Sequence, residues 1–173
     1  MDLLHYGLQR SGTNFLETLL KTNYRVRFLN IVDDRNSPLH KHCRLYSSRE
    51  MIPESQYENK IGIETFNQFQ ELLKVKPDYI LIVSKDPYSW YLSYKNWAQK
   101  CHWPNVDHHY IEEYNLFYRL FMNISSQSDT FIFIKYIDLI RDPSTSLRDL
   151  EEKMNLKNSF QLPYRGNKAG TFF

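Results

Sequence analysis

The chain has 173 residues, of which 42% are hydrophobic and 24% are charged, and its formal net charge is +2. This length suits a single domain with its own core, and the composition argues against an intrinsically disordered chain. A net charge so close to zero argues against a general nucleic-acid binder, so any basic site has to be local.

The two cysteines, Cys43 and Cys101, are too few and too isolated for a disulfide framework or a metal site. The sequence shows no basic leader followed by an apolar segment, and no apolar run long enough to span a membrane. No stretch rich in Pro, Gly or Ser divides the chain. We therefore expect one cytoplasmic domain over residues 1–173, with no bound metal, no membrane span and no nucleic-acid partner.

The first third of the chain predicts a strand, a helix, a second strand and a long loop. Residues 2–7 fit a short buried strand, and residues 13–22 carry apolar side chains at helical spacing. Residues 24–31 alternate well enough to predict a second strand. Residues 32–60 are polar and rich in turn formers, which predicts a long functional loop.

The rest of the chain alternates helices with strands. YILIVS, residues 79–84, is the strongest strand signal, a continuous apolar run of the kind that a parallel sheet buries on both faces. Pro87 then stands at the first position of a helix, where its missing N–H costs nothing. The other predicted elements are helices over 65–74, 87–100, 109–125 and 142–155, a strand over 130–136, and a loop-like tail over 162–173. This alternation predicts a three-layer α/β/α domain around a mainly parallel central sheet.

The segment LLHYGLQRSGTNFLETLL contains a glycine loop between the first strand and the first helix. Gly7 and Gly12 have the spacing of the phosphate-binding motif G-x-x-x-x-G-K-[ST], but Thr13 and Asn14 replace its lysine and its magnesium-binding hydroxyl. Such a loop directs backbone N–H groups and a helix dipole at one point. With Arg10 as the main positive charge, it favours an anion bound without a metal. The same residues also fit an ordinary strand-to-helix turn.

A second stretch, LIVSKDPYSWYLSYKNW, adds a lysine and a serine. Lys85 follows the strongest strand, at the carboxyl edge where open α/β sheets bind ligands. Ser93 lies two turns into the helix that follows, close enough to share an anionic group with Lys85. Taken alone, both residues could equally be solvent-exposed surface residues. They indicate a binding site only in combination with the glycine loop.

These stretches together resemble the sulfotransferases that use 3′-phosphoadenosine 5′-phosphosulfate (PAPS). RSGTNF is similar to the family's [KR]-S-G-T-[TN] loop, and KDPYSWYLS to its R-D-P motif with a serine eight residues after the arginine. FIFIKYIDL is similar to its late strand with a Tyr-x-Asp ending. The resemblance spans most of the chain and implies the P-loop NTPase-like sulfotransferase fold. The chain departs from the family in its shorter length and in Lys85, which lacks the bidentate fork of arginine.

The resemblance also implies PAPS as co-substrate and a nucleotide site on named residues, without a metal. The residues at the 5′-phosphosulfate would be Arg10, Ser11, Gly12, Thr13 and Asn14. The residues around the nucleoside and its 3′-phosphate would be Phe15, Lys85, Ser93 and Tyr136, together with Arg165 and Gly166 of the tail.

Arg10, His42 and Ser93 are the expected catalytic residues. Arg10 would stabilise charge on the leaving phosphate, and His42 would remove the acceptor proton. The dipeptide KH that ends at His42 is similar to a Lys-x-His segment of cytosolic members, with spacing that differs by one residue. His40 is therefore an alternative base, and Glu64 is another because some members use a glutamate.

Two other functions remain open from the sequence. A magnesium-dependent P-loop kinase would use Asp86 as its metal ligand, and Thr13 and Asn14 argue against it. A catalytically inactive nucleotide-binding module would keep the fold and the anion site alone. For an active enzyme we expect a small-molecule or glycan acceptor, in a pocket formed by residues 32–60 and the aromatic segment around Trp97, Trp103 and Tyr110.

Overall fold

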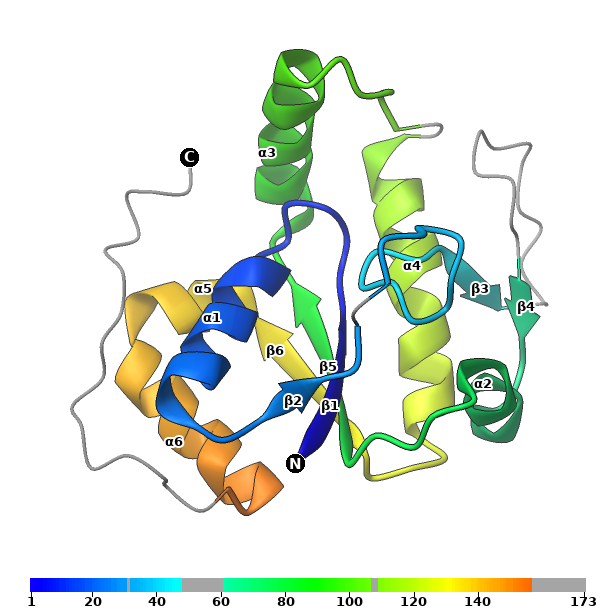
Figure 1. The fold of residues 1–173 in the computed structure, drawn as a ribbon. Coiled ribbons are helices and arrows are strands. Elements are labelled where there is room, and N and C mark those ends of the chain that lie inside the picture. Colours follow the sequence, from blue (N-terminus) through cyan, green and yellow to red (C-terminus); the bar gives the residue numbers. More distant parts are fainter. Residues whose placement is uncertain (31, 48–60, 107–108, 157–173) are drawn as a thin grey trace.

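The computed structural model describes residues 1–30, 32–47, 61–106 and 109–156 (Figure 1). Arg165 and Gly166, and with them the predicted tail, lie outside the described residues. So does most of the second half of the predicted loop over residues 32–60.

A four-stranded parallel sheet forms the centre of the fold, in the order β2-β1-β5-β6. Its strands are β1 (Asp2–Tyr6), β2 (Arg27–Phe28), β5 (Tyr79–Ser84) and β6 (Phe131–Lys135). β2 is much shorter than the predicted strand over residues 24–31. Tyr24 is the C-cap of the preceding helix, since its N–H donates to the carbonyl of Leu20 at 2.8 Å. The side-chain oxygen of Asn30 accepts the backbone N–H of His5 in β1 at 2.7 Å.

Three further elements were not predicted. β3 (Leu45–Ser47) lies inside the predicted long loop and pairs in parallel with β4 (Ile61–Ile63), so the prediction of a loop throughout residues 32–60 is wrong there. Leu45 is fully buried, and the partner that gives β3 its ladder is remote in sequence. At the end of β6 the chain turns at once into α5 (Tyr136–Arg141), so Tyr136 begins a helix rather than ending a strand.

The remaining helices agree with the predicted ranges to within one or two residues, and their caps explain where they begin. Thr65 forms a capping box with Gln68, and Asp86 and Asp142 each accept a hydrogen bond from a backbone N–H three residues ahead. These helices are α1 (Thr13–Asn23), α2 (Phe66–Leu73), α3 (Pro87–Lys100), α4 (Tyr110–Ser125) and α6 (Pro143–Met154). None of the helices in the described part of the chain combines the length and hydropathy that a membrane crossing needs.

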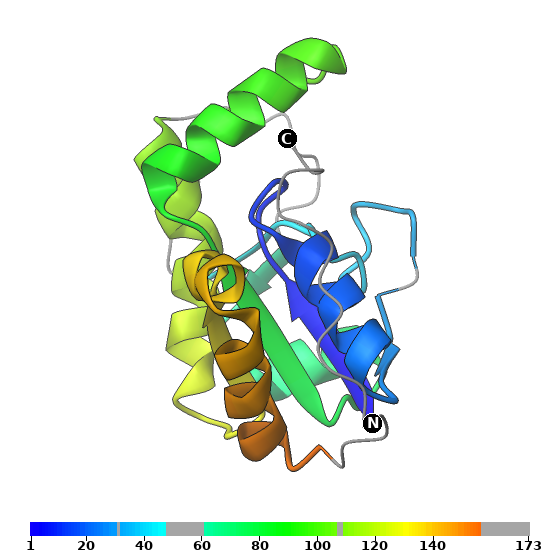
Figure 2. The same cartoon turned by 90° about the vertical axis from the view of Figure 1, so that its left-hand side faces the viewer.

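Helices cover both faces of the sheet, and this confirms the predicted three-layer α/β/α architecture. Alternate strand residues separate the two cores, because successive side chains in a strand point to opposite faces. Leu3, Leu81 and Val83 pack with α1, α5 and α6, whereas Leu4 and Ile82 pack with α2, α3 and α4. Figures 1 and 2 show α1 and α6 on one side of the sheet, with α4 on the other and α3 extending past the strand ends.

The connections of the sheet diverge at the boundary between β1 and β5. From β1 the chain passes through α1 to β2 on one side, and from β5 it continues to β6 on the other. The carboxyl ends of β1 and β5 therefore lie side by side at a topological switch point, where open α/β sheets form their ligand crevice. The glycine loop follows β1 directly, and Lys85 follows β5 directly.

Candidate functional site

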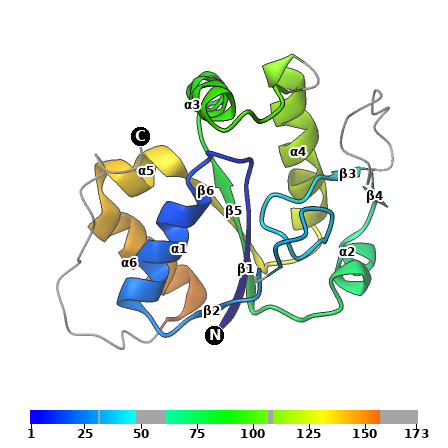
Figure 3. The ribbon, with the colours of Figure 1, turned by 45° about the horizontal axis from the view of Figure 1, so that its top comes forward.

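Two adjoining cavities open at this end of the sheet. The larger measures about 1110 Å³ and the smaller about 200 Å³, and five residues line both: Arg10, Lys85, Ser93, Trp97 and Tyr136. Figure 3 turns this end toward the viewer, with the start of α3 beside the loop that joins β1 to α1. The larger cavity lies between α3 and α5, and the smaller one lies over the first turn of α1.

Backbone geometry makes the glycine loop suitable for an anion. Gly12 is the N-cap of α1 with φ 103°, and it provides no side-chain cap for the first turn, which also contains no acidic residue. The N–H groups of that turn are therefore available to an anion at the positive end of the helix dipole. Arg10 adopts φ 72°, a left-handed conformation that costs energy outside glycine and is concentrated at functional loops.

Positive charge dominates the two cavities. Among the described residues that line them Asp86 is the sole carboxylate, and the cations are Arg10, Arg35, Lys85, Lys100 and Lys135. Burial lowers the pKa of Lys85, and the nearby charge of Arg10 lowers it further. Two cations held near each other repel, and a bound anion would relieve that repulsion.

Hydrogen bonds to the surrounding elements hold the glycine loop in place. Leu8 N–H donates to the hydroxyl of Tyr118 at 3.5 Å, and that hydroxyl donates to the carbonyl of Val83 at 2.7 Å. The carbonyl of Gln9 accepts from the indole of Trp90 at 2.8 Å. The loop is thus tied to β5, to α3 and to α4, which fixes the position of Arg10.

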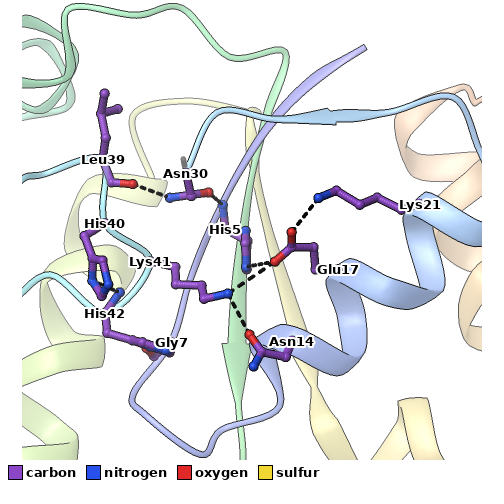
Figure 4. Close-up of polar contacts among 10 residues, drawn as sticks. All are labelled: His5, Gly7, Asn14, Glu17, Lys21, Asn30, Leu39, His40, Lys41 and His42. Carbon is purple, nitrogen blue, oxygen red and sulfur yellow. Dashed lines mark hydrogen bonds and ion pairs between the residues drawn. The ribbon is translucent and has the colours of Figure 1, made fainter. Parts of the chain in front are cut away.

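Lys41 is a contact of the glycine loop that sequence reasoning did not predict. Its ammonium donates to Asn14 Oδ1 at 2.6 Å and to Glu17 Oε2 at 3.2 Å, as Figure 4 shows. Glu17 also pairs with Lys21 at 2.6 Å. A lysine from a remote loop therefore lies at the first turn of α1, although Thr13 replaces the lysine of the motif itself. The sequence could not indicate this contact because it depends on how residues 32–44 fold back along β1.

His42 is fixed beside the glycine loop. Its Nδ1 donates to the carbonyl of Gly7 at 2.7 Å, and the N–H of Gly7 donates to the carbonyl of Lys41 at 3.1 Å (Figure 4). With the proton on Nδ1, Nε2 keeps a lone pair. Burial lowers the pKa of His42 to about 3, and the charges of neighbouring cationic groups act in the same direction. His42 is therefore neutral at physiological pH.

The other two candidate bases are placed less favourably. His40 accepts a hydrogen bond from the backbone N–H of His42 at 3.1 Å, and burial lowers its pKa. It does not line either of the two cavities. Glu64 follows β4, is exposed, and is likewise not a lining residue. Of the three candidates, His42 is the one that the structure brings to the cavity with Arg10.

The structure brings most of the predicted site together. The smaller cavity is lined by the predicted residues Arg10, Gly12, Thr13, Asn14, Phe15, His42, Lys85, Ser93 and Tyr136. Phe15 and Tyr136 meet edge to face at 6.0 Å between ring centroids. Ser11, which belongs to the glycine loop, is fully buried and lines neither cavity.

Replacing Gly12 by alanine is expected to destabilise the loop by about 1–3 kcal/mol and to weaken nucleotide binding. An added Cβ would lie 2.2 Å from Cδ2 of Tyr136, and the φ of 103° disfavours any side chain. Urea unfolding and nucleotide titration would measure both effects. The double variant Gly12→Ala with Tyr136→Ala should recover part of the stability, because the clash is removed while the backbone strain persists. A Gly12→Ala variant with wild-type stability and binding would contradict this account.

Stability should fall between pH 7 and pH 5 because two histidines are kept neutral by the fold. Burial lowers the pKa of His5 and of His42 to about 3 from an ordinary value of 6.5. The unfolded chain gains a proton at each below about pH 6.5 and the folded chain does not, which costs up to about 2 kcal/mol per histidine at pH 5. Urea unfolding at both pH values would measure the loss.

The same pH series has a matched pair of variants. The exposed residue His102 has a left-handed φ of 51°, which asparagine tolerates, so His102→Asn should retain the wild-type loss of stability. His42→Gln should lose less stability on acidification than the wild type. A stability that stays constant or rises from pH 7 to pH 5 would show that these histidines are not held neutral.

Comparisons with known proteins give one distant structural likeness. No protein-family model matches the chain, and no curated protein matches it. Among solved structures, the chain is similar to a crystal structure of the mouse sulfotransferase SULT7A1 complexed with PAP, at 14% sequence identity and a TM-score of 0.44. The match covers 91% of this chain and 58% of that one, so this chain spans less than two thirds of its length. A likeness of this size assigns neither an activity nor a role to any residue.

Proposed function

We propose that this domain is a metal-independent sulfotransferase that uses PAPS and transfers its sulfuryl group to an acceptor hydroxyl or amine. The observation that carries the proposal is the convergence of Arg10 and Lys85, from two neighbouring strand ends, on cavities whose described lining residues include five cations and one carboxylate. PAPS carries anionic groups at the 3′ and 5′ positions of its ribose, and a site with two separate cations at a switch point suits such a ligand.

The residues present fit this co-substrate. The open first turn of α1, with Arg10, would hold the 5′-phosphosulfate, and the close approach of Gly12 to Tyr136 leaves backbone rather than side chain at that position. Lys85 and Ser93 would hold the 3′-phosphate, and Phe15 and Tyr136 would contact the nucleoside. Bound PAPS supplies an activated sulfuryl group whose leaving phosphate Arg10 would stabilise.

His42 would serve as the base. It is neutral, its Nδ1–H is engaged by Gly7, and the remaining lone pair on Nε2 can accept a proton. A pKa of about 3 is low for this role; burial is its main cause, and neighbouring cationic groups lower it further. An anionic co-substrate in the cavity would offset the contribution of the cations and so raise that pKa.

The kinase alternative is disfavoured by the residues at the corresponding positions. Thr13, at the position of the motif lysine, is buried, and the amide of Asn14 accepts a hydrogen bond from Lys41. Asp86, the expected magnesium ligand of a kinase, caps α3 by accepting the N–H of Ser89 at 2.9 Å. Its carboxylate therefore has a structural role at the start of the helix.

The proposal is tested by incubating the protein with ³⁵S-labelled PAPS, in EDTA, and a panel of phenols, amines and sugars. Transfer of label to an acceptor, lost in Arg10→Ala, would support the proposal. Transfer that requires magnesium would contradict the proposal. Failure to transfer label to any acceptor would also contradict it and would favour an inactive nucleotide-binding module. The free thiols of Cys43 and Cys101 fit the reducing, cytoplasmic setting that we propose for it.

A further inference from the structure

A cation outside the proposed nucleotide site lines the smaller cavity. Arg35 is an exposed residue of the loop between β2 and β3, and it shares this cavity with Arg10 and His42. No carboxylate is found among the described residues that line this cavity. Arg10 and Lys85 are the cations assigned above to the nucleotide, so Arg35 is a cation of this cavity that has no assigned role.

The guanidinium of Arg35 lies over the ring of Trp103. Its Cζ lies 3.9 Å from the ring centroid of Trp103, and Trp103 packs at 5.8 Å between centroids against Trp97, which lines the same cavity. Stacking occupies the face of a guanidinium and leaves its N–H edge available, and that edge matches a carboxylate, sulfate or phosphate group. Asp33 and Asp34 precede Arg35, but none of the ion pairs between described residues joins either of them to it.

Arg35 and His42 belong to one folded loop. The carbonyl of Asp34 accepts the N–H of Ser37 at 3.0 Å, and the thiol of Cys43 donates to the carbonyl of Asn36 at 3.8 Å. These bonds close the loop on itself, so its cation and its histidine are held in a fixed relation. A molecule anchored by Arg35 would thus be bound in the cavity that the proposed base also lines.

We infer that the acceptor is an anionic molecule, whose carboxylate, sulfate or phosphate group binds Arg35 while its hydroxyl faces His42. This inference rests on the proposed function and narrows its substrate class. Neutral phenols and neutral sugars would leave Arg35 without a partner in the cavity, so they would bind more weakly than their anionic counterparts.

The inference is tested by binding in two matched pairs of acceptors. Protein saturated with 3′-phosphoadenosine 5′-phosphate is titrated with methyl β-D-glucuronide or methyl β-D-glucoside, and with 4-hydroxyphenylacetate or 4-hydroxyphenylacetamide. Tryptophan fluorescence reports binding, because Trp97 lines the cavity and Trp103 contacts Arg35. At least one anionic member should bind about tenfold more tightly than its neutral partner, as expected for one charge-assisted contact.

Variants separate a binding role from a packing role. Arg35→Gln should abolish the preference for the anion, Arg35→Lys should retain part of it, and Arg148→Gln, an exposed arginine of α6 that lines neither cavity, should leave it unchanged. Affinity for 3′-phosphoadenosine 5′-phosphate should be the same in all three variants. Equal binding within both pairs, or binding of none of the four molecules, would overturn the inference while leaving the proposed function standing. Failure of the wild type to bind the nucleotide would refute the proposed function itself.

Discussion

Glu113→Ala is expected to lower the free energy of unfolding by about 3–5 kcal/mol. Glu113 and Arg44 form an ion pair at 2.9 Å in which the two side chains are only 2% and 3% exposed. Removing the carboxylate takes this ion pair away from the buried guanidinium of Arg44, and breaking a buried pair costs far more than the loss of a surface ion pair. Urea unfolding at pH 7 measures the effect.

The adjacent residue provides the control for this variant. Glu112 is in the same turn of α4 but is exposed, so Glu112→Ala should change stability by less than about 0.5 kcal/mol. Replacing both members of the buried pair, as in Arg44→Met with Glu113→Leu, should restore much of the loss because no charge then remains buried. If Glu113→Ala were as stable as Glu112→Ala, the buried pair would not have the importance assigned to it.

The Glu113→Ala substitution should also affect the candidate functional site. Arg44 donates to Gln9 Oε1 at 3.2 Å, and Gln9 directly precedes Arg10 in the glycine loop. Rearrangement of Arg44 would therefore displace the residue that positions Arg10.

Lys85→Ala is expected to weaken binding of 3′-phosphoadenosine 5′-phosphate by about 10- to 100-fold, as for the loss of one or two hydrogen bonds to a charged group. Binding of AMP, which lacks the 3′-phosphate, should change much less. The physical reason is the position of Lys85 at the end of β5, with Ser93 and Arg10 in both cavities. Isothermal titration calorimetry measures the affinities.

A second lysine of the same segment is the matched control. Lys95 is exposed on α3 and lines neither cavity, so Lys95→Ala should bind the nucleotide as the wild type does. Burial and Arg10 lower the pKa of Lys85, and a bound phosphate should raise it again. Equal weakening of AMP and of the 3′-phosphorylated nucleotide in Lys85→Ala would place Lys85 somewhere other than at the 3′-phosphate.

Local signals in the sequence were strong enough to predict most of the fold. The apolar run YILIVS is β5 without change, and Pro87 begins α3 as its missing N–H indicated. Both depend on interactions within a few residues, or on burial of a whole strand. The glycine loop with Arg10, and Lys85 at the strand end, were likewise predicted, since their positions follow from the order of strands and helices.

What the sequence did not reveal depends on contacts between distant segments. β3 is a three-residue strand that exists because β4 pairs with it, and α5 begins where the apolar pattern of β6 was expected to continue. Lys41 reaches Asn14 across 27 positions of sequence, and Arg35 lies over the ring of Trp103, which follows α3. No periodicity or short motif encodes such pairs.

The central claim is that the crevice between β1 and β5 binds a 3′-phosphorylated nucleotide without a metal. The most direct test is calorimetric titration of the wild-type protein with 3′-phosphoadenosine 5′-phosphate in EDTA, beside AMP in EDTA and ATP with magnesium. The account predicts binding of the 3′-phosphorylated nucleotide at least about tenfold tighter than that of AMP, with no need for magnesium. Binding of magnesium-ATP alone, or no binding of the 3′-phosphorylated nucleotide, would contradict it.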